Sequence, residues 1–157
     1  MNNWYLIQTK PQQELTAAQN LVNQDYTVFH PQAKINNKIV ALFPRYLFIQ
    51  LDNQSQNWSP IHSTKGVSNF VRFGLQFAKV PDEVICCIKK RETKTANKYI
   101  DLGRFKSGDK VRVTEGTFKG CEAIFNSYNA DERLILLMKI IGQMQKVVLP
   151  KKSIVAA

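Results

Sequence analysis

The residues that could perform covalent or metal chemistry are few and unsuitably spaced for it. Three cysteines, Cys86, Cys87 and Cys121, and two histidines, His30 and His62, are the candidate nucleophiles or soft-metal ligands. Their spacing matches neither a CxxC pair nor a zinc pattern, and the chain has no GxxxxGK[ST] phosphate loop and no GxSxG turn. We therefore expect no catalytic activity, no metal and no cofactor, with the cysteines acting as small buried apolar residues.

A surplus of positive charge is the first indication of a partner. The chain has 22 Lys and Arg against 12 Asp and Glu, a formal net charge of +10 over 157 residues. A cationic surface attracts polyanions, which favours a nucleic acid or the surroundings of a ribosome. Moderately basic proteins are common, however, so charge alone leaves an ordinary solvated surface as the alternative.

Length and composition limit the class of protein. With 44% hydrophobic residues the chain is expected to fold, as one domain or two small ones. Its longest uninterrupted apolar run, residues 134–138, is far shorter than the roughly 18 residues that a membrane span requires. The first ten residues do not resemble a signal peptide, and three cysteines are too few for a disulfide framework. We expect a cytoplasmic protein, monomeric and independent of membranes.

Residues 1–92 predict an α+β domain, an antiparallel sheet with flanking helices. Strands are expected at 4–8, 26–29, 46–51 and 67–73, and the Asn36-Asn37 pair predicts the turn of a short hairpin. Pro11 is expected to open a helix with an apolar stripe formed by Leu15, Ala18, Leu21 and Val22. Pro81 is expected to open a second helix with acidic residues first and basic residues last, namely Asp82, Glu83, Lys89, Lys90 and Arg91.

The remaining residues predict a linker and a second, smaller domain. Residues 93–104 are polar and lack strong periodicity, as a linker would. Short β-rich runs at 110–114, 121–126, 133–141 and 146–149 are separated by turn residues, which predicts a small β-barrel within 105–157. The apolar run 134–138 fits a buried helix equally well, because a short apolar run does not reveal its period.

Four local patterns, in order, resemble the NusG family of transcription elongation factors over nearly the whole chain. They are WYLIQTK at 4–10, LFPRYLFIQ at 42–50, STKGVSNFVRFG at 63–74 and GDKVRVTEGTFKG at 108–120. The third resembles the specialised RfaH-like members more than the housekeeping ones, and the fourth resembles the KOW motif of the C-terminal barrel. The resemblance implies an N-terminal NusG-type domain (1–92), a linker (93–104) and a KOW domain (105–157).

The resemblance implies a binding protein without catalysis. Members of this family lie on RNA polymerase, contact the clamp helices of its β′ subunit and reduce pausing. The polymerase-facing residues implied here are Phe43, Pro44, Tyr46, Phe48 and Phe73. Alternation along a strand places Tyr46 and Phe48 on one side and Leu47 and Ile49 on the other, so both sides are apolar. An interaction surface explains the second apolar row, and burial in the core is the alternative.

RfaH-like proteins also bind the non-template DNA strand. The matching positions here are Lys10, Asn20, Asn23, Gln24, Thr64, Lys65, Gly66 and Arg72. Cations suit phosphates and amides suit base edges, but RfaH carries His and Arg where this chain has Asn20 and Asn23. We therefore expect an altered or weaker sequence preference. A solvated helix face, with ordinary surface charge, is the alternative for these residues.

The C-terminal half is implied to recruit a partner, either termination factor Rho or a small-subunit ribosomal protein. In RfaH it switches between a helical hairpin that masks the polymerase site and a β-barrel. An interdomain ion pair of RfaH corresponds here to Arg133 and Val40, so the pair is lost. Gly142 would also disfavour a helix, by about 1 kcal/mol relative to Ala. We expect the barrel, with a helical state as the alternative.

The function expected from these residues is that of a transcription elongation and antitermination factor acting at selected operons. Two rivals remain: a housekeeping NusG-like factor that acts on all genes, and a ribosome-associated RNA-binding protein, because KOW motifs also occur in ribosomal proteins. The GVSNFVRFG segment and the short chain favour the specialised factor.

Overall fold

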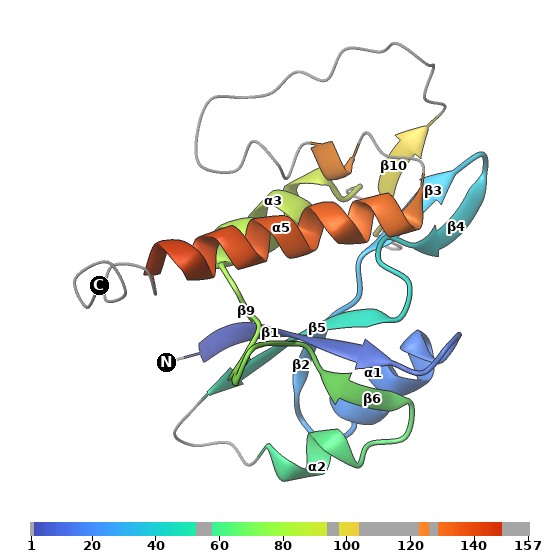
Figure 1. Ribbon diagram of the computed structural model, residues 1–157. Helices are drawn as coiled ribbons and strands as arrows, with labels where there is room; N and C mark the ends of the chain where they lie inside the picture. The colour runs from blue at the N-terminus through green and yellow to red at the C-terminus, as the bar shows by residue number, and fades with distance from the viewer. Residues whose placement is uncertain (1, 53–57, 94–97, 104–122, 126–128, 149–157) are drawn as a thin grey trace.

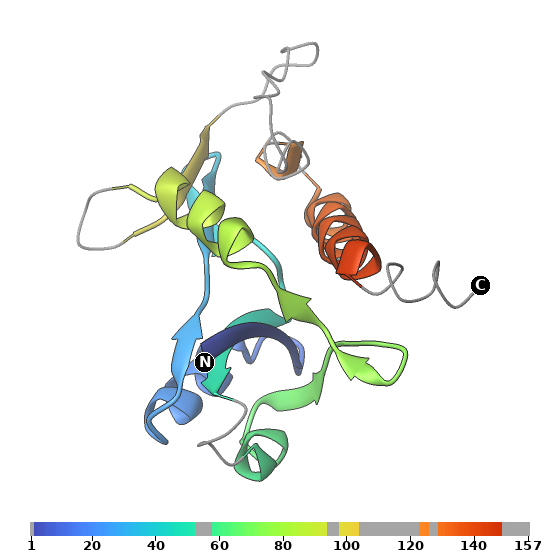
Figure 2. The same cartoon turned by 90° about the vertical axis from the view of Figure 1, so that its left-hand side faces the viewer.

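The computed structural model describes residues 2–52, 58–93, 98–103, 123–125 and 129–148. Figure 1 and Figure 2 show a sheet between two groups of helices, with α1 and α2 on one side and α3 and α5 on the other. The helices are α1 (Glu14–Val22), α2 (Ser59–His62), α3 (Asp82–Arg91) and α5 (Ala130–Val148). The strands are β1 (Asn2–Thr9), β2 (Thr27–Phe29), β3 (Gln32–Ile35), β4 (Lys38–Ala41), β5 (Tyr46–Asp52), β6 (Val67–Phe70), β7 (Arg72–Phe73), β8 (Gln76–Phe77), β9 (Lys79–Val80) and β10 (Ile100–Gly103).

Five strands of the described chain form the main sheet, and all of their pairings are antiparallel. The order is β2-β5-β1-β6, and β9 follows β6 along the same edge of β1. The predicted strands at 4–8, 26–29 and 46–51 are confirmed within a few residues. The predicted strand 67–73 is divided at Val71 into β6 and β7. The Val71 nitrogen still donates a hydrogen bond to the Leu6 carbonyl of β1, whereas β7 pairs with β8.

A second sheet lies beside the first, with the order β10-β3-β4. Asn36 and Asn37 form the turn between β3 and β4 with φ of 51° and 65°, as the sequence predicted. Strand β10, in the segment expected to be a linker, pairs in parallel with β3. The linker prediction therefore missed a strand, whose apolar residues Ile100 and Leu102 are buried. The division into two domains stays a prediction.

Helix α1 exists where it was expected, and its predicted apolar stripe is confirmed for Leu21 and partly for Ala18 but is wrong for the other two residues. Gln12 has φ of 61°, so the helix begins at Glu14 rather than near Pro11. Ala17 and Leu21 are buried, whereas Leu15 and Val22 are 66% and 50% exposed. Helix α3 follows the prediction, with acidic residues in its first turn and basic residues in its last. Acidic residues at the start of α3 and basic residues at its end both interact favourably with the helix dipole.

The buried side chains of the described residues form two clusters, one on each side of the main sheet. Leu47 and Ile49 pack towards α1 and α2, while Phe48 packs towards α3 and α5. The alternation predicted along β5 is therefore confirmed. Because both sides of β5 are covered, the strand has no apolar row facing solvent.

The C-terminal segment differs from the expected barrel. Residues 130–148 form the helix α5, so the strand predicted at 133–141 is wrong, and residues 146–148 are helical as well. The alternative of a buried helix for 134–138 is the one observed. The segment is helical rather than extended because its buried residues, Arg133, Leu137, Ile140 and Ile141, lie on one side of a helix. The strand predicted at 110–114, the KOW motif and residues 121, 122 and 126 lie outside the described residues. Residues 123–125 of the strand predicted at 121–126 are a short helical turn, so that prediction is wrong where the structure describes it.

Candidate protein and nucleic-acid interfaces

Four of the five residues implied to bind polymerase lie in the cluster on the α3 and α5 side of the main sheet. We call them the aromatic face: Phe43, Tyr46, Phe48 and Phe73. The fifth, Pro44, directly follows Phe43 in the chain. The rings of Phe43 and Phe48 meet edge to face, with centroids 6.0 Å apart. Phe43 and Phe48 are at most 1% exposed, Tyr46 and Phe73 are half-buried, and Pro44 is exposed.

Helix α5 covers this aromatic face. Its buried residues Arg133, Leu137, Ile140 and Ile141 recur at i, i+4, i+7 and i+8, which forms one stripe of an amphipathic helix. Leu137 and Ile141 share a cluster with Phe43 and Phe48 and are fully buried. On the same helix Ile135 remains 54% exposed, so the covering contact is confined to one side. A Cβ atom on Gly142 would lie 3.9 Å from the Phe73 ring, so the helix remains in contact with the face one turn beyond Leu137.

Arg133, in the first turn of α5, is bound to the backbone of the residue that precedes Phe43. Its Nε donates a hydrogen bond of 2.9 Å to the carbonyl oxygen of Leu42, and the side chain is 1% exposed. This burial lowers the pKa of the guanidinium. Val40, the position of the lost acidic partner, is 38% exposed. The sequence did not reveal that the carbonyl of Leu42, two residues after Val40, is a hydrogen-bond acceptor for Arg133.

Seven of the eight residues implied to bind DNA gather on the opposite side of the sheet, between α1 and the loop after α2. We call them the polar cluster: Lys10, Asn20, Asn23, Gln24, Thr64, Lys65 and Gly66. Gln24 Nε2 donates to Thr64 Oγ1 over 2.9 Å, and Asn20 Nδ2 donates to the Lys65 carbonyl over 3.2 Å. Lys65 is exposed while Thr64 is buried, so the cation extends from an anchored loop.

Gly66 explains how the loop comes so close to α1. Its φ is +96°, and a Cβ atom there would lie 2.9 Å from the Ala17 nitrogen. A side chain is therefore excluded both by backbone geometry and by contact. Its carbonyl accepts a hydrogen bond of 2.9 Å from the backbone nitrogen of Lys10, which joins β1 to the same loop.

Arg72, the eighth residue, lies apart from this cluster. It stands on β7 opposite Phe77, and its guanidinium carbon is 4.7 Å from the centroid of the Phe77 ring. Sequence reasoning missed the aromatic surroundings of Arg72, which include Trp58 and Phe70. The sequence contains little indication of this aromatic group, because Trp58 and Phe77 are 19 residues apart and neither lies in a segment with clear periodicity.

The described residues bear on the expectations for metal ligands, membrane spans and cysteines. No group of three or more His, Cys, Asp or Glu there could hold a metal ion. Within the same ranges no helix is long and apolar enough to cross a membrane. Cys86 is exposed and Cys87 half-buried, so the expectation that both act as buried apolar residues is wrong for Cys86. Cys121 lies outside the described residues.

The two surfaces, an aromatic sheet surface covered by an amphipathic helix and an amide and lysine cluster on the far side, are of the kinds that bind helices and nucleic acids. Residues 2–89 match the family model described as transcription termination factor nusG. This match covers more than half of the chain, and the chain belongs to the NusG family. The expectation of a transcription factor without catalytic activity is thereby confirmed.

The chain is also similar to individual proteins. The chain is 26% identical to the transcription termination/antitermination protein NusG of Thermus thermophilus, with 98% of both chains covered. It is also 26% identical to the corresponding Helicobacter pylori protein, covering 87% of this chain and 88% of that one. A solved structure described as domain interaction in Thermotoga maritima NusG matches with a TM-score of 0.47 and 19% identity, over 57% of this chain and 56% of that one.

Proposed function

We propose that this NusG-family protein is a specialised, RfaH-like elongation and antitermination factor whose polymerase-binding surface is masked by α5. In this proposal the aromatic face binds the clamp helices of the β′ subunit of RNA polymerase. The polar cluster binds the displaced non-template DNA strand. Residues 105–157 recruit a further partner, a small-subunit ribosomal protein or Rho.

The observation that carries the proposal is the helix seated on the aromatic face. Phe43, Phe48, Leu137 and Ile141 are all fully buried against one another or their neighbours. A surface that accommodates one amphipathic helix has the shape and the apolar character to accept another. Because α5 and the clamp helices would use the same face, only one of them can occupy it at a time. The face is then available to polymerase only after α5 leaves.

The two-sided arrangement supports simultaneous contact with polymerase and DNA. The aromatic face belongs to the cluster on the α3 and α5 side, whereas Ala17 and Leu21 of α1 belong to the other. Thr64 and Gln24 are bonded to each other beside α1, on the side away from α5. A DNA strand bound there would not compete with a helix on the aromatic face.

The test is a pull-down from lysate with the full chain carrying Leu137→Glu, compared with Ile135→Glu on the exposed side of the same helix. Burying a carboxylate at Leu137 is costly, so α5 should leave the face, whereas position 135 remains in solvent. We expect RNA polymerase to be recovered with the first variant and much less with the second. Recovery of ribosomal subunits without polymerase would instead support a ribosome-associated RNA-binding protein.

Deletion of the gene separates the specialised factor from a housekeeping one. A factor that must be unmasked should act on few transcription units, because most transcribing polymerases would never release α5. We expect altered transcript levels in a small set of operons. Changes across most genes would favour a general NusG-like factor.

A further inference from the structure

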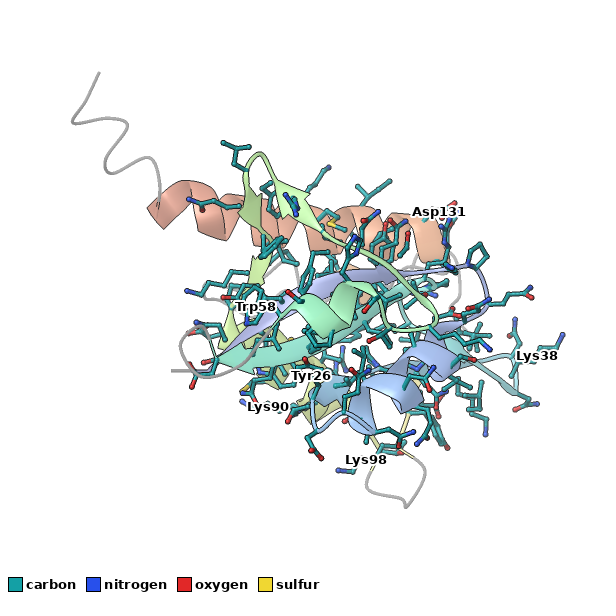
Figure 3. All side chains as sticks on the ribbon, turned by 90° about the horizontal axis from the view of Figure 1, so that it is seen from below. Tyr26, Lys38, Trp58, Lys90, Lys98 and Asp131 are labelled. Carbon is teal, nitrogen blue, oxygen red and sulfur yellow. The ribbon has the colours of Figure 1, made fainter. Side chains whose placement is uncertain are left out.

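An open depression lies at the β6 edge of the main sheet, on the side away from α5. Its volume is about 680 Å³, and it is lined by side chains from α2, β6, β7 and β8, including Trp58, His62, Asn69, Phe70, Arg72 and Phe77. Figure 3 shows Trp58 near one side of the molecule and Lys38 at the other. We call these six residues the stacking pocket.

The aromatic rings of the stacking pocket lie nearly parallel. Trp58 stacks on Phe70 and on Phe77, with centroids 5.7 and 5.4 Å apart and interplanar angles of 20° and 27°. Phe70 and Phe77 stack on each other at 4.6 Å. Trp58 remains half-buried rather than enclosed, and its Nε1 donates to the Asp52 carbonyl over 3.4 Å. The ring is thus held in place at the edge of an open space.

The polar groups around these rings suit an anionic and planar ligand. Arg72 is exposed, and its guanidinium carbon lies 4.7 Å from the centroid of the Phe77 ring, so its N–H donors can reach a phosphate beside the rings. His62 and Asn69 are exposed and offer a ring and an amide for hydrogen bonds. Among the described residues that line the pocket none is acidic.

The pocket also continues directly from the polar cluster. Helix α2 ends at His62, and Thr64 follows two residues later with its hydroxyl donating to the Pro60 carbonyl of α2 over 2.7 Å. A strand passing Lys65 would therefore reach His62 without crossing the sheet. Proteins that bind single strands commonly stack the bases on aromatic rings and contact the phosphates with cationic side chains.

We propose that the stacking pocket binds an unpaired base of single-stranded DNA, with the base stacked on Trp58, the ring stack of Phe70 and Phe77 supporting Trp58, and the phosphate on Arg72. This inference rests on the proposed DNA contact and adds a second subsite to it. It assigns functions to Trp58, Phe77, His62 and Asn69, which have none in the account of the polar cluster. It also gives Arg72, the residue separated from that cluster, a place beside the DNA.

The test uses the full chain and a labelled 12-nucleotide single strand containing 5-iodouracil. Irradiation of the wild-type protein should attach the strand to Trp58 or Phe77, as mass spectrometry of the peptides would show. By fluorescence anisotropy, Trp58→Ala should weaken binding at least fivefold, because each stacked base contributes about 1–3 kcal/mol. Trp58→Phe, which keeps a flat ring, should retain most of the affinity. Arg72→Ala should weaken binding more than Lys38→Ala, a control that removes the same charge far from the pocket.

The outcomes separate this inference from the proposed function. Cross-links confined to the polar cluster, with Lys65→Ala weakened and Trp58→Ala unchanged, would overturn the stacking pocket and leave the DNA contact standing. No salt-dependent binding by the wild-type chain would overturn both. Trp58→Ala could also unfold the loop around α2, so its far-ultraviolet circular dichroism is compared with that of wild type, and the wild-type cross-link then decides. Capture of a protein rather than DNA at Trp58 would equally refute the proposal.

Discussion

Leu137→Ala is expected to expose the aromatic face without disturbing the helix that covers it. Leu137 is fully buried in the contact between α5 and the sheet. Truncating such a leucine costs about 2–5 kcal/mol, while Ala is at least as good a helix former as Leu. The change should therefore weaken the docking of α5 and leave its helical propensity intact.

The size of the effect follows from the docking equilibrium. A loss of about 2–5 kcal/mol shifts the ratio of docked to released helix by roughly 30-fold to a few thousand-fold. The apparent affinity for polymerase is reduced by the fraction of molecules in which the face is open. The apparent affinity for polymerase should therefore rise in proportion to the fraction of molecules with an open face. It should stop rising once most molecules have released α5.

The assay is titration of the labelled full chain with RNA polymerase, and Ile135→Ala serves as the matched control. Ile135 lies on the same helix but is 54% exposed, so its truncation should change the docking energy by about 0.5 kcal/mol or less. Hydrogen exchange of the α5 amides reports release independently. If Leu137→Ala speeds that exchange and the polymerase affinity stays at the wild-type value, α5 does not mask the binding surface and the reasoning is refuted.

Three further changes test other parts of the account. In the Leu137→Ala background, Tyr46→Ala should weaken polymerase binding by about 1 kcal/mol or more, as interface aromatics do, and an unchanged titration would remove Tyr46 from the surface. Lys65→Ala should lower the slope of log affinity for single-stranded DNA against log salt by about 0.7, the value for one phosphate contact, and an unaltered slope would place Lys65 elsewhere. Burial lowers the pKa of His30, whose Nε2 has no hydrogen-bond partner among the residues that the structure describes, so this histidine takes up a proton in the unfolded chain first as the pH falls. The free energy of unfolding should therefore decrease as the pH is lowered past about 6.5. Urea denaturation between pH 7.5 and 5.5 measures this decrease, and a decrease of equal size in His30→Gln would contradict the assignment to His30.

Much of the N-terminal fold was predictable because its signals are local. The Asn36-Asn37 pair specified the hairpin turn through positive φ, and the alternation along Tyr46–Leu51 correctly separated the two sides of β5. The error in the predicted stripe of α1 has a tertiary cause. The loop at Gly66 approaches Ala17, so that residue is buried in place of the larger Leu15.

The C-terminal segment was not predictable from its composition. Residues 134–138 are apolar throughout, and such a run can be buried in a helix or in a strand. What decides in favour of a helix is a partner distant in sequence, since the Leu42 carbonyl accepts a hydrogen bond from Arg133 and the aromatic face receives Leu137. A single sequence does not display such a contact. The stacking pocket was missed for the same reason, because Trp58 and Phe77 meet only through the sheet.

We propose above all that the aromatic face binds RNA polymerase once α5 has left it. The most direct measurement is photo-crosslinking from benzoylphenylalanine in place of Tyr46, in the full chain carrying Leu137→Ala, mixed with purified polymerase. The account predicts a cross-link to the β′ subunit, which becomes weaker when Leu137 is restored, and none from the same probe in place of Tyr26 on the other side of the sheet. Equal cross-linking from both positions, or none from position 46, would contradict it.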